Sequence, residues 1–319
     1  MTTPLHAVPQ YPASVRITSR LWAALRAVFA ANQPVLAELA SFWTMFLWHG
    51  QHRVRVSQVD GFLVVRFAVE PLEAMVVALP GATVTAAVVE ALDDLIGVAA
   101  LRYLSAATVR ALAPYVAARG LHAIASPDDA DYVFSVECLA ALRSSDPATP
   151  GRKLGKAKEA RALDEAGGAQ ITERRLSDPA ALDHLLATYD RWTGAKFDGA
   201  PSPAIVQEHD GMLRWPRGPE ADALTVFCMS IDDQPIGVSV VESAWNRTWL
   251  GLLFKTDRGV EGSTAYLRRH VARRALDVLG PAGRLSIGQD DGVPGLRTGK
   301  RAYGPLPFEP KFALRPSGS

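Results

Sequence analysis

The stretch that decides the fold is LTVFCMSIDDQPIGVSVVESAWNRTWLGLLF, residues 224–254. Its three apolar runs are rich in the β-branched and aromatic residues that strands favour, and they lie at Leu224–Ile231, Ile236–Ser243 and Thr248–Phe254. Asp232-Asp233-Gln234-Pro235, between the first two runs, is typical of a turn. The sequence therefore predicts a three-stranded antiparallel meander.

A helix and two short strands are predicted after the meander. Ser263–Leu279 has helical periodicity, begins at a serine suited to an N-cap and ends before Gly280-Pro281. Leu285–Ile287 and Phe308–Leu314 are short apolar runs typical of strands. This order of meander, helix and further strands resembles that of GNAT-type acyltransferases. We therefore expect an α/β (α+β) fold in which a mixed, mostly antiparallel sheet is flanked by helices.

The first half of the chain follows the same style. An Asp60-Gly61 pair separates two β-rich runs within Val54–Phe67, which is a strong hairpin signal. Other expected elements are a strand at Ala74–Leu79, helices at Thr83–Ile96 and Ala106–Ala118, and a strand at Tyr132–Val136. Because 319 residues exceed what one hydrophobic core usually serves, two domains are expected. The breaker-rich Ser144–Gly151 favours GNAT-like domains at residues 1–150 and 151–319 around a shared cleft.

Composition narrows the classes of function. Lys and Arg number 34 and Asp and Glu 33, so the chain as a whole does not attract nucleic acid, and such a contact needs a local basic patch. The two cysteines, Cys138 and Cys228, exclude a disulfide framework and lack metal-ligand spacing, so we expect no metal and no cofactor. The start shows no leader pattern, and no apolar run is long enough to span a bilayer. These features predict a cytoplasmic protein without a membrane partner.

The sharpest motif is QDDGVPGLRTGKRAY, Gln289–Tyr303. Its two acids, closely spaced glycines and proline argue against a regular element, and the glycines let the backbone approach a ligand. Arg297 and Lys300 are three residues apart and share one face of a turn, where they can hold a phosphate or a carboxylate. Asp290 can orient Arg297 or accept a proton from an amine. The alternative is a surface loop with an ordinary salt bridge, and the residues alone leave both open.

This motif resembles the C-terminal signature of the DUF2156 group, which includes the soluble domain of phosphatidylglycerol lysyltransferases. The matching positions are Gln289, Asp290, Gly292, Gly295, Leu296, Arg297, Lys300, Tyr303 and Pro305. Two other stretches resemble the family in the same order along the chain. Ser41–Trp48, followed by the hairpin, is similar to the family's early aromatic segment, and Asp131–Leu139 is similar to its Asp-Tyr-Val-Tyr-Ser strand and the helix after it.

The resemblance implies two fused GNAT folds and a transferase that uses aminoacyl-tRNA, whose ester is attacked by a nucleophile of the acceptor. The lysyltransferases also carry a membrane domain, and none is visible here, which favours the amine or hydroxyl of a soluble small molecule as acceptor. The expected catalytic residues are Asp290, Arg297 and Lys300. The expected substrate contacts are Gln289, Gly292, Gly295 and Tyr303 in the motif, with Trp192 at a helix end and Glu242 at a strand end.

Basic side chains offer two surfaces for tRNA phosphates. The candidates are Lys255, Arg258, Arg269 and Arg273 in and before the helix 263–279, and Arg152, Lys153 and Lys156 in a second basic run. In both places a solvated basic face is an equal alternative. The second run is also looser than the compact Lys-Arg-Asn-like cluster that the family usually carries there.

Two other classes of function stay open. An acyl-CoA-dependent GNAT N-acyltransferase needs a glycine-rich loop at a helix start to cradle the pyrophosphate. Arg258–Ser263 occupies that place, but its spacing is wrong by one residue and Glu261 brings a negative charge to the phosphates. The second alternative is a non-catalytic GNAT relative that binds a ligand.

Overall fold

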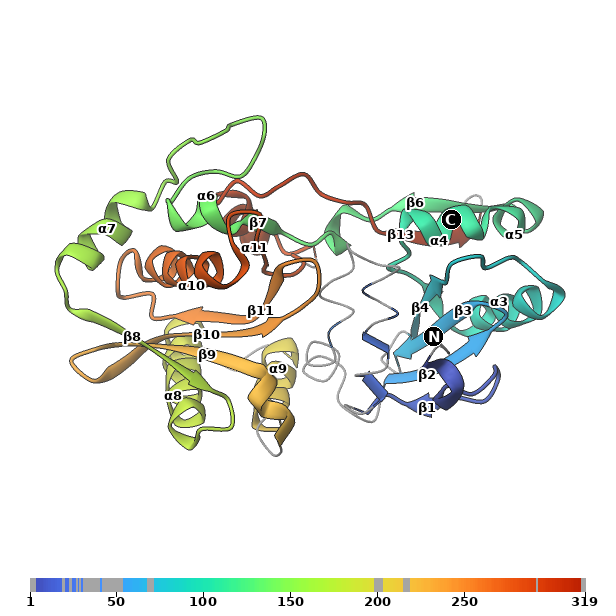
Figure 1. Cartoon of the computed structure of the whole chain (residues 1–319), viewed down its shortest axis with the longest axis horizontal. Helices are drawn as coiled ribbons and strands as arrows, with labels where there is room; N and C mark the ends of the chain where they lie inside the picture. The colour runs from blue at the N-terminus through green and yellow to red at the C-terminus, as the bar shows by residue number, and fades with distance from the viewer. Residues whose placement is uncertain are drawn as a thin grey trace. The chain divides into compact units, whose positions relative to one another are not determined.

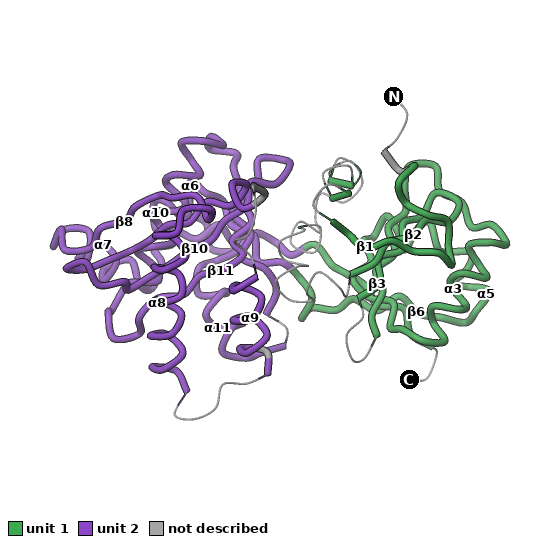
Figure 2. Tube along the Cα trace, turned by 90° about the horizontal axis from the view of Figure 1, so that it is seen from below, with its two compact units in different colours: residues 1–130, 309–319 green, residues 131–308 purple. Residues whose placement is uncertain are grey.

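The computed structural model describes residues 4–18, 21–22, 25–26, 28, 30, 41, 54–67, 72–197, 203–214, 219–290 and 292–316. The chain forms two compact units (Figure 2): unit 1 comprises Met1–Ala130 and Glu309–Ser319, and unit 2 comprises Asp131–Phe308. The boundary expected at residue 150 is therefore wrong, because unit 2 begins earlier and the end of the chain returns to unit 1. Of the early aromatic segment, residues 42–48 lie outside the described part of the chain.

Ser144–Gly151 is a loop inside unit 2. The Ser144 N–H donates to the Arg152 carbonyl (2.8 Å), and the Leu154 N–H donates to the Leu142 carbonyl (3.0 Å). These hydrogen bonds close the two ends of the loop on each other, so the chain leaves and re-enters the same unit. The turn-forming composition correctly indicates a loop, but it does not mark a domain boundary.

Unit 1 contains a five-stranded sheet of order β1-β2-β3-β4-β5 and a two-stranded sheet, β13-β6. Its elements are η1 (Pro4–Ala7), β1 (Val15–Arg16), β2 (Val54–Val59), β3 (Phe62–Phe67), β4 (Glu73–Ala78), α3 (Ala86–Val98), β5 (Ala100–Leu101), α4 (Ala106–Ala111), α5 (Ala113–Ala118), β6 (Leu121–Ala125), η2 (Pro127–Asp129) and β13 (Phe312–Pro316). The Asp60-Gly61 hairpin is confirmed, with Val59 paired to Phe62. Helix α3 carries the chain from β4 to a parallel β5, and β13 pairs antiparallel with β6.

Two expected elements of unit 1 differ from the sequence prediction. The single helix expected over Ala106–Ala118 is two helices, α4 and α5, which meet at Leu112. Pro114 explains the break, since it has no N–H to continue the helical ladder. The strand expected at Phe308–Leu314 begins only at Phe312, and it belongs to unit 1 rather than to the second domain.

Unit 2 contains a six-stranded sheet of order β7-β12-β11-β10-β9-β8. Its elements are β7 (Val133–Ser135), α6 (Val136–Ala140), α7 (Ala157–Glu165), β8 (Ala169–Arg175), α8 (Pro179–Lys196), α9 (Pro203–Arg214), η3 (Pro219–Ala223), β9 (Leu224–Ile231), β10 (Gln234–Ser243), β11 (Thr248–Thr256), α10 (Ser263–Leu279), β12 (Arg284–Ser286) and α11 (Pro294–Arg301). The predicted meander is β9-β10-β11, and it is antiparallel throughout. Helix α10 then leads to β12, which pairs parallel with β11.

Helices cover both faces of this sheet. In Figure 1, α10 lies above β10 and β11 and α8 lies below them, and both helices contact these strands. One hydrophobic core joins Phe227 and Trp249 of the sheet to Leu267, Val271 and Ala275 of α10. The sheet is thus the middle layer of three, and its strand ends carry the side chains described next.

The start of α10 differs from the prediction in one respect. The N-cap residue is Gly262, in the left-handed conformation (φ 79°), and Ser263 is the first helical residue. The Ser263 hydroxyl donates to the Asp257 carbonyl (3.1 Å) instead of capping the helix. A glycine is favoured at this position because its φ is positive.

Candidate functional site

Asp290 is the centre of the C-terminal motif. Its Oδ2 accepts hydrogen bonds from the Tyr132 hydroxyl (2.6 Å) and from Arg297 Nε (2.9 Å). Its Oδ1 accepts from Arg297 Nη2 (3.0 Å) and from the Gly292 N–H (2.9 Å). The carboxylate is buried, with 1% of its surface exposed, and the bonds from Arg297 hold its pKa at about 2 although burial acts to raise it.

This geometry separates the two roles that the sequence left open for Asp290. Both carboxylate oxygens already accept two donors each, and a carboxyl with a pKa of about 2 is a poor proton acceptor at neutral pH. Asp290 therefore orients Arg297. The bidentate pair fixes the guanidinium, whose side chain remains 33% exposed, at the rim of the motif.

Lys300 holds the loop that precedes α11. Its ammonium donates to the Ile287 carbonyl (2.7 Å) and to the Gln289 carbonyl. Contrary to expectation, the motif contains a regular element, because helix α11 runs from Pro294 to Arg301. Pro294 lies in the first turn, where an N–H would have no partner within the helix and its absence is therefore tolerated. Lys300 joins this helix to the end of β12, which is a positioning role.

The remaining motif residues are mainly architectural. Gly292 has a φ of 73°, so the turn favours a glycine there, whereas Gly295 lies in α11 with open space around it. Tyr303 is 9% exposed, and its ring packs edge-on against Phe134 (centroids 6.5 Å apart). Gln289 is half-buried and contributes its carbonyl to Lys300.

Arg268 of α10 is a site residue that the sequence analysis missed. Its guanidinium lies 4.3 Å from the centroid of the Tyr303 ring and 5.7 Å from that of the Phe254 ring. Its Nε is buried and has no hydrogen-bond partner within the described ranges, and burial lowers the pKa of the guanidinium. The only signal in the sequence was an arginine in a basic helix, which does not distinguish a buried side chain from a solvated one.

A second cluster lies at the end of β11. The Lys255 ammonium is 2.8 Å from Glu208 Oε2, and the Tyr189 hydroxyl donates to the same oxygen (2.9 Å). The side chains of Lys255 and Glu208 are 13% and 4% exposed. Burial and the neighbouring Glu208 raise the pKa of Tyr189. Lys255, expected to contact tRNA on the surface, is therefore enclosed with a carboxylate.

Aromatic rings complete the Lys255 cluster. The ammonium lies 4.0 Å from the centroid of the Trp192 ring and 5.5 Å from that of the Tyr189 ring, distances at which a cation is attracted to the ring face. The Lys196 ammonium also lies 4.6 Å from the centroid of the Trp192 ring, but Lys196 is exposed. Trp192, expected to contact substrate, thus forms part of this cluster, whereas Glu242 is buried in β10 opposite Leu224 and Leu250.

The two clusters lie on two strands that separate. β12 pairs with β11 at Thr248–Leu250, and β11 runs on to Thr256 beyond this pairing. On its other edge, the chain after β12 continues the pairing with β7, where the Tyr132 carbonyl accepts from the Ile287 N–H (3.0 Å). Lys255 lies on the part of β11 beyond its pairing with β12, and Asp290 follows β12. Diverging parallel neighbours leave backbone and side-chain groups for a ligand, as in other open sheets.

Some of the other predicted tRNA contacts form ion pairs with described residues, and the rest form none within the described ranges. Arg269 is 14% exposed and bonds to Asp164 (2.6 Å), which also lies 3.8 Å from Arg273, so these arginines join α10 to α7. Lys156 pairs with Glu261 (3.2 Å). Arg258, Arg152 and Lys153 are exposed. Within the described ranges no group of three His, Cys, Asp or Glu could hold a metal ion, and no helix is long and apolar enough to cross a membrane.

The family model described as phosphatidylglycerol lysyltransferase, C-terminal, matches residues 36–315. The chain belongs to this family. The DUF2156 resemblance is thereby confirmed, as are the α/β fold with sheets flanked by helices and an activity of the acyl- or aminoacyltransferase kind. No curated protein matches the chain.

Several solved structures share the fold. A conserved protein of unknown function from Bacteroides thetaiotaomicron is 18% identical, with a TM-score of 0.73 over 94% of this chain and 98% of that one. The DUF2156 C-terminal domain of a lysylphosphatidylglycerol synthetase from Agrobacterium fabrum is 14% identical (TM-score 0.52, covering 83% and 84%). FemX is 12% identical (TM-score 0.53, covering 94% and 96%). At these identities the likeness concerns the fold.

Proposed function

We propose that this chain moves an aminoacyl group from an aminoacyl-tRNA to an amine or hydroxyl of a soluble small molecule in the cytoplasm. Membership of a lysyltransferase family supports the aminoacyl group, and its ester to tRNA is an already activated donor. The observation that carries the choice of donor is the packing at the start of α10, where an acyl-CoA enzyme of this fold would bind its pyrophosphate.

The start of α10 is covered by α7. A Cβ at Gly262 would lie 2.7 Å from the carbonyl carbon of Glu159, so the two backbones are in direct contact. Lys156 bridges Glu261 (3.2 Å) and Glu159 (3.7 Å) beside this contact. A helix N-terminus attracts phosphates only where its N–H groups are accessible, and two carboxylates repel them. These contacts favour aminoacyl-tRNA over acyl-CoA.

The proposed step is a direct displacement at the ester carbonyl. The acceptor nitrogen or oxygen forms a bond to the carbonyl carbon, and the bond from that carbon to the ribose oxygen of the terminal nucleotide breaks. The acceptor loses a proton and the ribose oxygen gains one. Positioning and stabilisation of the negative carbonyl oxygen are the work left to the protein.

Lys255 is the residue that we assign to the carbonyl oxygen. It brings a positive charge to the open part of β11, and Glu208 and Trp192 fix its ammonium, so little reorganisation is needed when the oxyanion forms. The same combination of carboxylate and aromatic rings suits the ammonium of an amine acceptor. Arg297, fixed by Asp290, is the proposed contact for a donor phosphate.

The donor is tested with two labelled substrates, a mixture of aminoacyl-tRNAs and acetyl-CoA, each incubated with the protein and with amines from a cell extract. We expect loss of label from one tRNA, with RNase abolishing the reaction. Turnover of acetyl-CoA alone would replace the proposal by an ordinary GNAT N-acyltransferase. Binding of tRNA without any turnover would favour a ligand-binding relative.

The assignment of Lys255 is tested by Lys255→Gln with Lys196→Gln as matched control, since both lysines contact Trp192 but Lys196 is exposed. Loss of an oxyanion-stabilising donor typically lowers kcat by about 10²–10³-fold. We expect that loss for Lys255→Gln and less than about a twofold change for the control. A folded Lys255→Gln protein with the wild-type rate would remove Lys255 from the mechanism.

A further inference from the structure

Five cations gather where the 142–154 loop meets α7. They are Arg143, Arg152, Lys153, Lys158 and Arg161, all of them exposed. None forms an ion pair or a side-chain hydrogen bond with another described residue, whereas most of the basic residues on α10 are paired. Unpaired cations that outnumber the carboxylates around them create a local positive potential in a chain of nearly zero net charge.

The loop places two of these cations directly opposite each other. Arg143 and Lys153 form an antiparallel bridge, the position at which cross-strand side chains are closest. Like charges at such a pair repel, and a carboxylate would ordinarily be found opposite a cation. An anion bound beside this pair would relieve the repulsion.

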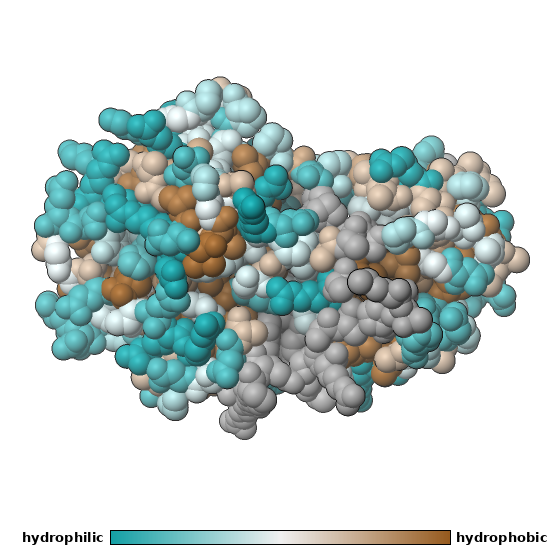
Figure 3. All heavy atoms as spheres, viewed as in Figure 1, coloured by the Kyte–Doolittle hydropathy of each residue, from teal (hydrophilic) through white to brown (hydrophobic). Residues whose placement is uncertain are grey.

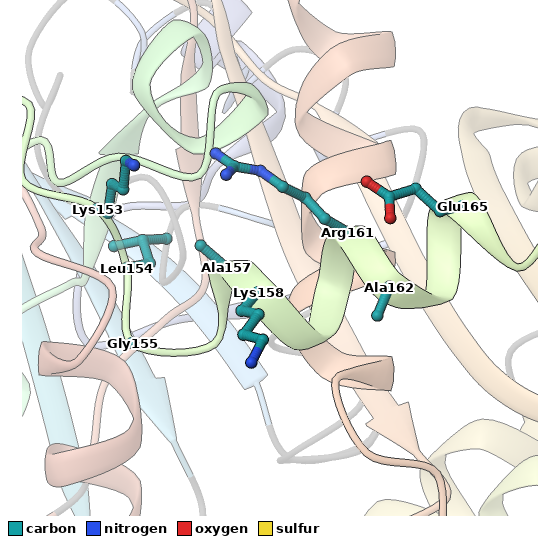
Figure 4. A pocket seen from close by; sticks show the side chains of 8 residues that line it. All are labelled: Lys153, Leu154, Gly155, Ala157, Lys158, Arg161, Ala162 and Glu165. Atoms are coloured by element: carbon teal, nitrogen blue, oxygen red, sulfur yellow. The ribbon is translucent and has the colours of Figure 1, made fainter.

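Helix α7 has two different faces. One face joins α10 through Lys156 and Asp164, which pair with Glu261 and Arg269. Figure 4 shows Arg161 extending from this helix toward the loop that carries Lys153, with Lys158 one turn earlier. The carboxylates of the first face form ion pairs with Lys156 and Arg269, and they do not neutralise the cations of the second face.

The cations of the second face line a hollow. It has a volume of about 400 Å³, and its charged lining consists of Lys153, Lys158, Arg161 and a single carboxylate, Glu165. In the view of Figure 3, hydrophilic residues dominate the surface over α7. None of the large exposed apolar side chains of the described residues lies between residues 142 and 165. A basic surface that enters a membrane usually carries such side chains, so the composition favours a polyanion in water.

We propose that this α7 surface, formed by Arg143, Arg152, Lys153, Lys158 and Arg161, binds the phosphate backbone of the tRNA that carries the aminoacyl group. This inference rests on the proposed function and adds to it the place where the body of the donor docks. The contact is electrostatic and independent of base sequence, because exposed Lys and Arg side chains neutralise phosphates without reading bases. Lys156, part of the basic run in the sequence, is excluded from the surface by its pairing with Glu261.

The test compares two triple variants that lose the same charge. One replaces Lys153, Lys158 and Arg161 by Gln, and the control replaces Arg110, Arg247 and Arg284, which are exposed elsewhere in the chain. Binding of deacylated tRNA is measured between 50 and 200 mM salt. We expect the α7 variant to bind at least about tenfold more weakly at the lower salt, with the slope of log K against log salt reduced by about 3, so that the difference shrinks as the salt concentration rises. The control should keep the wild-type slope within about 1.

Transfer from two donors separates this inference from the proposed function. With full aminoacyl-tRNA the α7 variant should react more slowly, whereas with an aminoacylated CCA trinucleotide, which has no body to dock, it should match the wild type. No transfer by the wild-type protein from either donor would remove the proposed function, and the binding data would still decide the α7 surface. Unchanged tRNA binding in the α7 variant overturns the inference. So does loss of binding to phosphatidylglycerol vesicles with tRNA binding intact, because the surface would then face a membrane.

Discussion

Replacing Asp290 by Asn tests the clamp that holds the C-terminal motif. Each oxygen of Asp290 accepts two donors, so whichever way the amide is turned, its NH₂ group faces two donors that have lost their acceptor. The substitution also removes the negative charge of Asp290 from beside the Arg297 guanidinium. Because the variant keeps the shape of the side chain, its loss of stability measures charge and hydrogen bonding rather than packing.

The magnitude follows from the pKa of Asp290. The native pKa of about 2 lies below the reference value of 3.8, and at about 1.36 kcal/mol per pH unit this difference contributes roughly 2 kcal/mol to the free energy of unfolding at neutral pH. Because the native pKa is the lower one, this stabilisation is present above pH 3.8 and is lost as the pH falls toward 2. At pH 3 roughly half of this stabilisation, about 1 kcal/mol, remains.

Urea unfolding of wild-type protein and Asp290→Asn at pH 7 and pH 3 measures this contribution. We expect the variant to be less stable by about 2–4 kcal/mol at pH 7, which corresponds to a melting temperature lower by roughly 5–10 °C for a unit of this size. The gap should narrow by about 1 kcal/mol at pH 3. Equal stability at pH 7, or a gap that is constant between the two pH values, would refute the reasoning.

Two further substitutions test the surroundings of the motif. Gly304→Ala should destabilise the protein by at least about 2 kcal/mol, since φ is 58° and the new Cβ would lie 1.9 Å from Ser144 Oγ. Gly295→Ala has open space around it in α11, so it should be neutral or stabilise the protein by up to about 1 kcal/mol. Thermal melting of the two variants and the wild type measures both effects. Tyr132→Phe removes one donor to Asp290 and should cost about 1 kcal/mol in urea unfolding, with an unchanged stability counting against the buried hydrogen bond.

Local structure was predictable from the sequence wherever one pattern determined it. The meander of β9, β10 and β11 follows from alternating apolar runs and from turn residues that lie beside them. The partner of β13 was not predictable, because an apolar run shows that a strand is present and not which sheet it joins. The same limit explains the misplaced domain boundary: Ser144–Gly151 has the composition of a linker, and only the hydrogen bonds at its ends show that it is a loop within unit 2.

In the candidate site, too, some contacts could be predicted from the sequence and others could not. The link between Asp290 and Arg297 could be expected, since the residues are seven positions apart on one motif. The enclosure of Lys255 could not, because its partner Glu208 lies on α9, far away in the sequence, and each looks like an ordinary surface charge by itself. Arg268 was missed for the same reason, as its burial depends on Tyr303 and Phe254 from two other elements.

These placements change the part that the motif plays. Asp290 accepts hydrogen bonds from Arg297, and Lys300 donates to the carbonyls of Ile287 and Gln289, so the most recognisable residues of the chain fix the loop that follows β12. Under the proposed function, the reacting groups are sought on β11 and α10, where Lys255 and Arg268 bring positive charge with little exposure to solvent. The motif can therefore serve the site through the geometry that it maintains, and the reacting groups need not belong to it.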